Sequence, residues 1–355
     1  MQITVMHPAE LGSVEIQAWH EMQHKTSSLM NPFLCPEFSM GVGLVRPTAR
    51  AAVLTEGQET VGFFPFERKR FGVGTPIGAG LNNCQGLIHA PDVKWQARDI
   101  LRACKVSAWQ FDNLINGQPS FERYAVAQVP SGAIDLTDGI DAYKEKLRLK
   151  SPRFYKELGR KIRSLQRDFG ELRFVADSRD MREFRTLMKW KSDQCRENDW
   201  VDMFSRSWVV DLVDYLFNTR NDVFSSWLGI LYAGETPIAG QFGLRSEGFF
   251  AGWFTAYDST FKQYSPGLIQ AIDGTEVLAA AGVQCIDLGG TSDYQNKLKN
   301  HDIYSTRGMV TAGPVAAGVH HIRTASADLA RRKIRRYPPL YRAADQILRL
   351  SGRLA

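Results

Sequence analysis

Cysteine is scarce in this sequence and shows no pairing pattern. Its five cysteines are scattered and form no C-x-x-C motif: Cys35, Cys84, Cys104, Cys195 and Cys285. An odd, dispersed set argues against a disulfide framework and against a cysteine zinc site. Residues 1–10 have neither a basic nor an apolar region of the kind that begins a signal peptide. We therefore expect a protein of the reducing cytoplasm.

Long apolar runs and the common catalytic signatures are also missing. No uninterrupted apolar stretch approaches the roughly 18 residues of a membrane span. There is no Walker A loop, no G-x-S-x-G, no H-E-x-x-H, and no G-x-G-x-x-G between a strand and a helix. The glycine-rich residues 72–80 have the wrong spacing for a phosphate loop, and we expect a plain turn there. The histidines show no ligand-like spacing beyond the pair His320-His321, so we expect no metal.

Charge is present but concentrated in two segments. The chain has 355 residues, 44% of them hydrophobic, enough for one large or two ordinary domains. Its formal net charge is +6. Residues 144–167 hold ten Lys and Arg against two acidic residues, and residues 322–355 hold nine against two. The remainder is acidic overall, so the pattern does not favour a protein that coats nucleic acid.

The first part of the chain reads as a mixture of strands and helices. Short β-type runs at 51–54 and 60–66 surround turns, and a helical stretch at 95–105 follows. The basic segment then predicts an amphipathic helix from 154 to Gly170. Its apolar stripe is Leu158, Ile162, Leu165 and Phe169, and its cationic stripe is Lys156, Arg160, Arg163 and Arg167. Two more helices are predicted at 181–197 and 207–218.

Residues 224–290 predict an antiparallel meander, then a helix, then a strand. Strands at 227–232, 237–244 and 249–257 are separated by the turns AGET and RSEG. A polar loop leads to Pro266 at the start of a helix, with Ser265 as its cap, and this helix ends before Gly282. A buried strand at 285–288 could pair beside the meander.

The helix that begins at Pro266 has the features of an anion site. Helix N-termini present unpaired N–H groups and a positive dipole end. Gly267 would let a ligand approach the backbone, and Lys262 is close in sequence, so a pyrophosphate could bind there. An ordinary Ser-Pro cap explains the same residues.

The order of these motifs resembles a known family. PIAGQFGL at 237–244, FTAYD at 254–258, YSPG at 264–267, DLGG at 287–290 and Tyr294 resemble the acyltransferase half of GNAT-superfamily proteins. The resemblance covers roughly residues 145–300 and points to the CelD-like polysaccharide-biosynthesis acyltransferases, which are similar to the Fem aminoacyltransferases. The run NPFLCPEF at 31–38 also looks like the opening of these proteins.

This resemblance implies an α+β fold of two tandem GNAT-like domains, each a mixed central sheet flanked by helices. We expect residues 1–140 to form an N-terminal GNAT-like domain without a donor site and residues 141–310 to form the acyltransferase domain. Residues 311–355 would be a basic tail. Only the acyltransferase domain would bind acyl-CoA, in a gap where strands 237–244 and 249–257 splay apart.

The resemblance also implies a site for each part of the donor. Pantetheine would pair with the backbone near Phe254 and Thr255, and the pyrophosphate would rest on the amides of Tyr264, Ser265, Gly267 and Leu268, with Lys262 nearby. A backbone N–H in the gap would polarise the thioester carbonyl.

Amine acylation also requires removal of a proton from the amine. Asp258 and Asp287, each at the end of a strand, are the candidate bases; both could instead have structural roles. Tyr294 matches the tyrosine with which many GNAT enzymes protonate the leaving thiolate. A structural tyrosine explains it equally well.

Three lower-ranked residues could contact the acceptor. Lys191 and Gln194 lie near the edge of the predicted helix 181–197. Relatives often have a lysine after the tyrosine, but here Gln295 follows Tyr294. Lys297, three residues after Tyr294, could replace that lysine in binding a phosphorylated acceptor.

Three functions remain open. We expect a cytoplasmic enzyme that transfers an acyl group, most simply acetyl, from coenzyme A to an amino sugar or its nucleotide- or lipid-linked form in surface-polysaccharide synthesis. The first alternative is Fem-like transfer from aminoacyl-tRNA to a cell-wall precursor, because the basic helix would also suit tRNA. The second is a non-catalytic scaffold whose basic tail contacts anionic lipid at a membrane surface.

Overall fold

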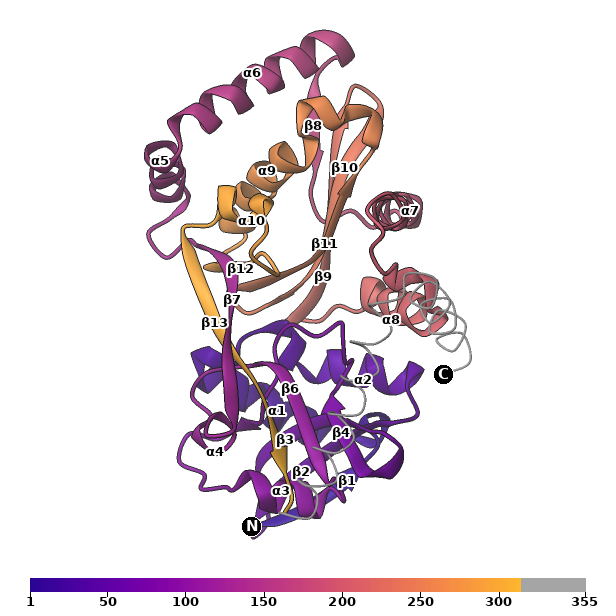
Figure 1. The fold of residues 1–355 in the computed structure, drawn as a ribbon, viewed down its shortest axis with the longest axis vertical. Coiled ribbons are helices and arrows are strands. Elements are labelled where there is room, and N and C mark those ends of the chain that lie inside the picture. The colour runs from indigo at the N-terminus through magenta and orange to yellow at the C-terminus, as the bar shows by residue number, and fades with distance from the viewer. Residues whose placement is uncertain (314–355) are drawn as a thin grey trace, which may run out of the picture.

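A computed structural model describes residues 1–313 of the chain. Within these residues the strands form one mixed sheet of 13 strands, twelve of them in the order β1-β2-β3-β4-β6-β13-β7-β12-β11-β10-β9-β8, with β5 pairing to β3. Figure 1 shows an elongated molecule with two lobes stacked along this sheet. We call residues 1–124 the N-lobe and residues 136–300 the C-lobe.

The N-lobe builds the first end of the sheet. Its strands are β1 (Gln2–Met6), β2 (Ala49–Glu56), β3 (Glu59–Arg68), β4 (Val73–Pro76), β5 (Ile88–His89) and β6 (Ala108–Leu114). Its helices are α1 (Ser13–Lys25), α2 (Pro36–Val45), α3 (Ala97–Ala103) and α4 (Pro119–Glu122), with short 3-10 turns η1 (Pro8–Glu10), η2 (Ser27–Leu29), η3 (Pro32–Leu34) and η4 (Arg70–Gly72).

The C-lobe builds the other end. Its strands are β8 (Leu172–Val175), β9 (Phe224–Ala233), β10 (Thr236–Ser246), β11 (Phe249–Tyr257) and β12 (Cys285–Asp287). Its helices are α5 (Ile140–Lys150), α6 (Pro152–Phe169), α7 (Met181–Glu197), α8 (Ser207–Asn218), α9 (Pro266–Ala280) and α10 (Asp293–Leu298), with 3-10 turns η5 (Met203–Ser205) and η6 (Ser259–Tyr264). The predicted helices after 150 and the meander are confirmed, to within a few residues at each end.

Two long strands join the lobes. β7 (Ala125–Asp135) pairs with β12 of the C-lobe, and β13 (His301–Thr311) pairs with both β7 and β6 of the N-lobe. The chain therefore passes from the N-lobe into the C-lobe along β7 and returns along β13 (Figure 1). The two lobes share a continuous backbone hydrogen-bonded sheet.

The lobes also share a hydrophobic core, which fixes their relative position. One cluster of buried side chains joins Trp19 of α1 and Phe38 of α2 to Leu212 of α8 and Phe242 of β10. An added Cβ at Gly41 of α2 would lie 2.8 Å from the ring of Tyr215, so α2 and α8 pack closely through this glycine. A cavity between the lobes is therefore bordered by elements whose relative position is fixed by packing.

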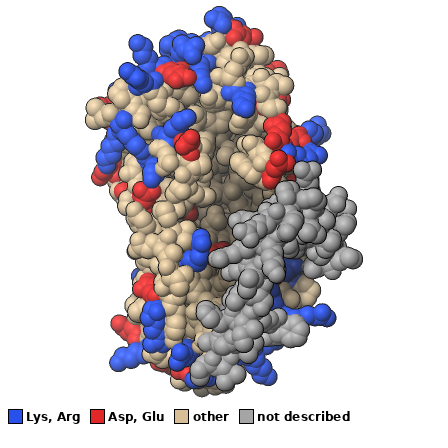
Figure 2. Space-filling view, viewed as in Figure 1, with Lys and Arg blue, Asp and Glu red and all other residues tan. Residues whose placement is uncertain are grey.

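Helices cover both faces of the C-lobe sheet. α7 and α8 pack on the face that looks toward the shared core, whereas α9, α10 and the α5–α6 pair cover the opposite face (Figure 1). The amphipathic prediction for α6 is confirmed for most of its length, since Leu158 and Leu165 are buried, Ile162 is half-buried and the predicted cationic stripe is exposed. Phe169, the last residue of the predicted apolar stripe, is exposed at the end of the helix. Figure 2 shows Lys and Arg gathered at this end of the molecule.

The prediction of a plain turn at residues 72–80 was partly wrong. Residues 73–76 form strand β4, which pairs with β3 and, in parallel, with β6. Four residues are too few to show a strand period, and glycine lowers β propensity, so sequence alone reads a turn here. The positive φ that a turn needs occurs in this run at Gly72, before β4, and at Gly78 and Gly80, after it.

Two further expectations concern other parts of the chain. Among the described residues, no helix has both the length and the apolar composition to cross a membrane. The basic segment 322–355 and the pair His320-His321 lie outside the described residues, as does most of the predicted tail.

Candidate active site

The sheet of the C-lobe opens between β11 and β12. These strands pair in parallel only over Phe249 to Ala251, opposite Cys285 to Asp287. Beyond Asp287 the chain stays with β7, because the Leu288 N–H donates to Gly132 O and the Gly132 N–H donates to Gly290 O. β11 continues to Tyr257, so the two strands diverge.

The predicted position of this gap was therefore wrong. Strands 237–244 and 249–257 were expected to splay, but β10 and β11 pair from Ala239↔Tyr257 to Ser246↔Phe249. A tight hairpin keeps its two strands paired, whereas a parallel pair joined by a helix can separate at its free ends. The gap is bordered by β11 and β12, and the helix between them is α9.

A β-bulge marks the mouth of the gap. Phe242 pairs with Phe254 and Gly243 with Gly252, which leaves Trp253 without a partner on β10. Bulges bend a strand and change where its groups point. Phe254 and Thr255, predicted to pair with the acyl donor, follow the bulge on the edge of β11 that no described strand covers.

A buried amide network lines the α9 side of this edge. Thr255 Oγ1 donates to Gly240 O at 2.9 Å, and Gln270 Nε2 donates to Gln241 Oε1 at 3.1 Å. Gln241 is 8% exposed, and its Nε2 lies 3.0 Å from where a Cβ at Gly252 would stand. A side chain at 252 would therefore fill the mouth of the gap beside this amide.

The start of α9 lies at the far end of the same gap. Ser265 has φ 56° and ψ 50°, the left-handed conformation, at the N-cap position. The Gly267 N–H has no hydrogen bond to any described residue, whereas the Leu268 N–H donates to Ser265 O at 3.0 Å. Of the predicted run of free amides, Pro266 has no N–H and Leu268 is already bonded, so Gly267 carries the open donor.

The basic helix α6 supplies a cation at this point. Lys161 Nζ donates to Ser265 Oγ at 2.8 Å, and its side chain is about a quarter exposed. Ser265 therefore occupies the predicted cap position without capping through its hydroxyl. We call the Gly267 N–H, Ser265 Oγ and Lys161 Nζ the anion seat. Sequence reasoning missed Lys161 because it lies 104 residues away in the chain.

Tyr264 and Lys262 point away from the anion seat. The Tyr264 hydroxyl donates to Asp168 Oδ2 at 2.9 Å and its ring makes an edge-to-face contact with Phe169, so Tyr264 connects η6 to α6. Lys262 lines a separate surface cavity of about 600 Å³, together with Gln194 of α7 and Asp258. Asp258 caps η6 by accepting hydrogen bonds from the Thr260 N–H and hydroxyl.

The other expected acceptor residues do not reach the gap. Lys191 Nζ donates to Gln194 Oε1 at 3.0 Å and lies over the ring of Trp200, and burial lowers the pKa of this lysine. Lys297 is exposed on α10. Gln194 thus remains a candidate only for the α7 surface cavity, and Lys191 is not among the residues that line it.

Tyr294 of α10 lies across the gap from β11, on the α9 side. Its hydroxyl is 3.4 Å from Gly267 O and interacts with Thr255. Burial raises the pKa of this phenol well above its usual range, with a smaller opposing effect from Thr255. Tyr294 is therefore a protonated donor beside the anion seat.

Asp287 lies on the opposite face, at the end of β12. Adjacent residues of a strand point to opposite faces, so Ile286 packs toward α9 while Cys285 and Asp287 face the N-lobe. Asp287 is 4% exposed; its Oδ1 accepts from Ser131 Oγ at 2.6 Å and from the Gly289 N–H at 2.9 Å. The Ser131 Oγ in turn accepts from the Gly290 N–H.

The two oxygens of the Asp287 carboxylate differ in their partners. Burial raises its pKa, and the hydrogen bonds from Ser131 and Gly289 oppose this in part. Both bonds go to Oδ1, and no described residue bonds to Oδ2. One oxygen is thus held in place and the other remains free to accept a proton.

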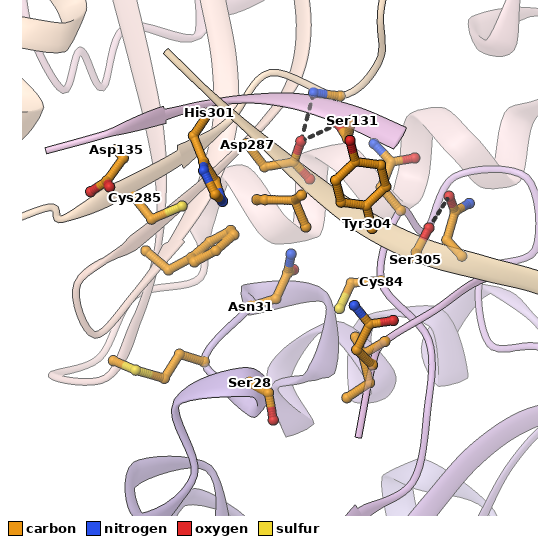
Figure 3. A pocket seen from close by; sticks show the side chains of 18 of the residues that line it. Ser28, Asn31, Cys84, Ser131, Asp135, Cys285, Asp287, His301, Tyr304 and Ser305 are labelled. Carbon is orange, nitrogen blue, oxygen red and sulfur yellow. Dashed lines mark hydrogen bonds between the residues drawn. The ribbon is translucent and has the colours of Figure 1, made fainter. Parts of the chain in front are cut away.

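Asp287 lines a cavity of about 590 Å³ between the lobes. We call it the inter-lobe cavity; Asn31, Cys84, Ser131, Asp287, His301 and Tyr304 are among its lining residues. Figure 3 shows these side chains converging from η3, β7, β12, β13 and the loop after β4. Ser131 and Asn31 were not predicted as site residues, since each is brought to Asp287 only by the joining of the lobes.

The comparisons with known proteins agree with this topology. Residues 152–297 match the model of a family described as an acetyltransferase (GNAT) domain. No curated protein matches the chain.

Solved structures match over most of their length at low identity. FemX is 11% identical with a TM-score of 0.53, over 87% of this chain and 96% of that one. The C-terminal domain of an Agrobacterium fabrum protein called a lysylphosphatidylglycerol synthetase is 9% identical with a TM-score of 0.52, over 87% and 95%. A tandem GNAT protein from the clavulanic acid pathway is 10% identical with a TM-score of 0.47, over 88% and 99%.

At such identities the likeness shows the fold alone. The expected fold of two tandem GNAT-like units on mixed sheets flanked by helices is confirmed. The CelD-like branch stays a prediction. The stretch that matches the acetyltransferase (GNAT) domain, residues 152–297, runs from α6 to α10 of the C-lobe.

Proposed function

We propose that this protein is an N-acyltransferase that moves an acyl group, acetyl in the simplest case, from coenzyme A to an amine held in the inter-lobe cavity. One observation carries the proposal: the gap between β11 and β12 has an anion seat and Tyr294 on one face and Asp287 on the other. Donor and acceptor can approach a common point from opposite sides of the sheet.

The residues on the α9 face fit an acyl-CoA. The uncovered edge of β11 offers backbone groups to pantetheine at Phe254 and Thr255. The anion seat would hold the pyrophosphate through the Gly267 N–H, Ser265 and Lys161. The Gln241 amide beside Gly252 is a donor for the thioester carbonyl oxygen, which gains negative charge as the amine attacks.

Asp287 and Tyr294 divide the proton transfers. Only a neutral amine attacks, so the free Oδ2 of Asp287 accepts the proton that nitrogen loses as the new C–N bond forms. The C–S bond then breaks, and the Tyr294 hydroxyl donates a proton to the departing sulfur. The buried phenol is protonated at neutral pH, as this role requires. Asp258 is assigned a structural role as the cap of η6.

The acceptor class rests on the family resemblance. We infer an amino sugar, free or linked, of the kind used in surface polysaccharides. The polar side chains of the inter-lobe cavity, among them Asn31, Ser131 and Tyr304, are compatible with such a ligand.

Titration calorimetry with acetyl-CoA tests the donor. We expect binding by the unmodified protein and its loss in Gly267→Glu, because the new carboxylate would occupy the anion seat. The substitution suits the fold: a Cβ there meets only Tyr257 at 3.5 Å, and acidic residues favour a helix start. Gln263→Glu is the matched control, since it adds the same charge at an exposed position.

Lys161→Met provides an independent test of the same seat. It removes the cation and leaves the backbone donors, so we expect the Kd for acetyl-CoA to rise about tenfold, the effect of one charge-assisted hydrogen bond. If no acyl-CoA binds but aminoacyl-tRNA does, the Fem-like alternative is correct. The exposed cations of α6 would then account for the binding of the tRNA phosphates. If neither binds, the enzymatic proposal fails.

A further inference from the structure

Asn31 is a buried polar side chain of the N-lobe that faces the proposed chemistry. It precedes η3 as its N-cap and is 7% exposed. Figure 3 shows it pointing into the inter-lobe cavity, toward the wall that carries Asp287. The family-like run NPFLCPEF begins at this residue, and the proposed donor site makes no use of it.

The orientation of the Asn31 amide is fixed by the backbone. Its Oδ1 accepts from the Phe33 N–H at 3.0 Å, and an N–H can donate only to the oxygen of the amide. The Nδ2 group therefore turns into the cavity, and no described residue accepts a hydrogen bond from it. This atom is not among the fully buried side-chain atoms that lack a partner, so it is reachable from the cavity and can donate to a ligand oxygen.

The charge of the cavity limits what that ligand can be. No Lys or Arg of the described chain lines the cavity, whereas Asp135 and Asp287 do. Hydrogen bonds from Thr137 lower the pKa of Asp135, which keeps its carboxylate negative. A phosphate here would meet two carboxylates with His301 as the one basic side chain of the lining, while an amine and neutral hydroxyls would be well accommodated.

We propose that the inter-lobe cavity selects the ring of an amino sugar that carries no phosphate, and that Asn31 is its specificity-determining residue. The amine would lie at Asp287 Oδ2, and a ring hydroxyl oxygen would accept from Asn31 Nδ2. This inference rests on the proposed function for the role of Asp287. The cavity volume of about 590 Å³ lies within the range of small-molecule sites. Any phosphate of a linked acceptor lies outside the cavity.

Ligand binding without acyl donor tests this selection. The probes are glucosamine, galactosamine and mannosamine, with cyclohexylamine as an amine without hydroxyls and glucosamine 6-phosphate as the charged analogue. By calorimetry and saturation-transfer NMR we expect the best of the three amino sugars to bind about tenfold more tightly than either comparison ligand. Equal or tighter binding of glucosamine 6-phosphate, or no preference over cyclohexylamine, overturns the proposal.

Asn31→Ser tests the residue itself. Serine also caps a helix start, so the Phe33 N–H keeps an acceptor, but the Nδ2 donor is lost. We expect about a tenfold loss for the amino sugar and none for cyclohexylamine. Asn218→Ser, an exposed amide on α8, is the matched control and should change neither. Should Asn31→Ser fold poorly, Asn31→Asp keeps Oδ1 and lacks the donor. An unchanged ratio between sugar and cyclohexylamine in the folded variant contradicts the role.

Turnover separates this proposal from the proposed function. With acetyl-CoA as donor, Asn31→Ser should raise the KM for the amino sugar about tenfold with kcat nearly unchanged, because the bond is made in both ground and transition states. If acetyl-CoA binds and amines are acylated without sugar preference, only the cavity assignment fails. If sugars bind selectively but no acyl-CoA does, the donor assignment fails and the cavity assignment stands.

Discussion

The two lobes contain the same local arrangement with opposite outcomes. In each, two parallel strands are joined through a helix: β4 and β6 through α3 in the N-lobe, and β11 and β12 through α9 in the C-lobe. In the N-lobe, the chain after β4 returns between the strands. There Gln85 forms a parallel bridge to Leu114, and its side chain accepts from the Asp112 and Asn113 N–H groups. In the C-lobe, no described segment fills the gap.

The starts of the two helices differ in the same way. The Ala97 N–H, the first of α3, donates to Ser120 Oγ at 2.8 Å. The Gly267 N–H of α9 has no partner in the described chain and stands beside Lys161 and Ser265. One helix start is satisfied by the protein, and the other is flanked by groups suited to an anion.

This difference shows what turns a shared fold into a binding site. Parallel strands and a connecting helix do not suffice, because the chain itself can occupy the opening. The comparison supports the proposal that only the C-lobe binds an acyl donor. The N-lobe contributes instead Asn31 and the loop with Cys84, which close the acceptor side.

The largest expected effect comes from substituting a buried carboxylate in each lobe, Asp287 in the C-lobe and Glu67 in the N-lobe. Asp287→Asn should lower kcat by about 10²–10⁴-fold, since the base is lost while Oδ1 still accepts from Ser131 and Gly289. Glu67→Gln in the N-lobe is the counterpart. Glu67 is 1% exposed and paired with Arg46, so its substitution should reduce stability by about 3–5 kcal/mol without a role in chemistry. Thermal melts and steady-state rates on both variants check this.

The pH profile gives the control for this first prediction. A base must be deprotonated, and burial raises the pKa of Asp287. Activity should therefore fall with decreasing pH at a higher pH than an ordinary carboxylate would cause, and Asp287→Asn should lack that limb. A profile that is the same in both proteins contradicts the assignment.

A smaller effect, on stability, is expected in α9 and α3, the helices that connect the parallel strands of each lobe. Asp273 of α9 has a pKa raised to about 6 by burial, with a further contribution from Glu276 and opposition from Lys144. The folded protein thus holds this proton more tightly than the unfolded chain, so its stability falls as pH rises from about 4 through 6. Asp273→Asn removes that loss and should stabilise the protein by about 3 kcal/mol at pH 7.5.

Urea unfolding at two pH values checks the Asp273 prediction. The gain should be absent at pH 4, where the proton is bound in both states. Asp99→Asn in α3 is the matched control, because Asp99 is exposed and paired with Arg102, and its effect should stay below about 0.5 kcal/mol. A stabilisation that is equal at both pH values would show that burial of the charge is not its cause.

Much of the C-lobe could be predicted from sequence. The stripe of Leu158 and Leu165 and the turns of the meander follow from local periodicity, and β11 was predicted with its observed ends. The start of α9 was recognised from Ser265 and Pro266. These features depend on residues within a few positions of one another.

The site could be predicted only in part, because its geometry depends on distant pairing. Tyr294 and Asp287 were named, but which strands separate depends on β12 pairing with β7, a segment about 150 residues earlier. Lys161 reaches Ser265, and Asn31 reaches the cavity, only after the helices and lobes have packed. No local pattern contains that information, and the misplaced gap was its consequence.

The smallest expected effect tests the two helix starts directly. Ser120→Ala leaves the partly buried Ala97 N–H without its acceptor, which should cost about 1 kcal/mol of stability. Because α3 lies in the N-lobe, where the chain itself fills the opening between the parallel strands, kcat and the KM for acyl-CoA should not change.

Ser265→Ala is the corresponding variant in the C-lobe. Lys161 retains its ion pair with Glu157, so stability should be unchanged while the KM for acyl-CoA rises a few-fold. Melting temperature and steady-state kinetics on both variants decide it. If Ser120→Ala weakens acyl-CoA binding as much as Ser265→Ala does, the N-lobe opening is not closed, and the distinction between the lobes is wrong.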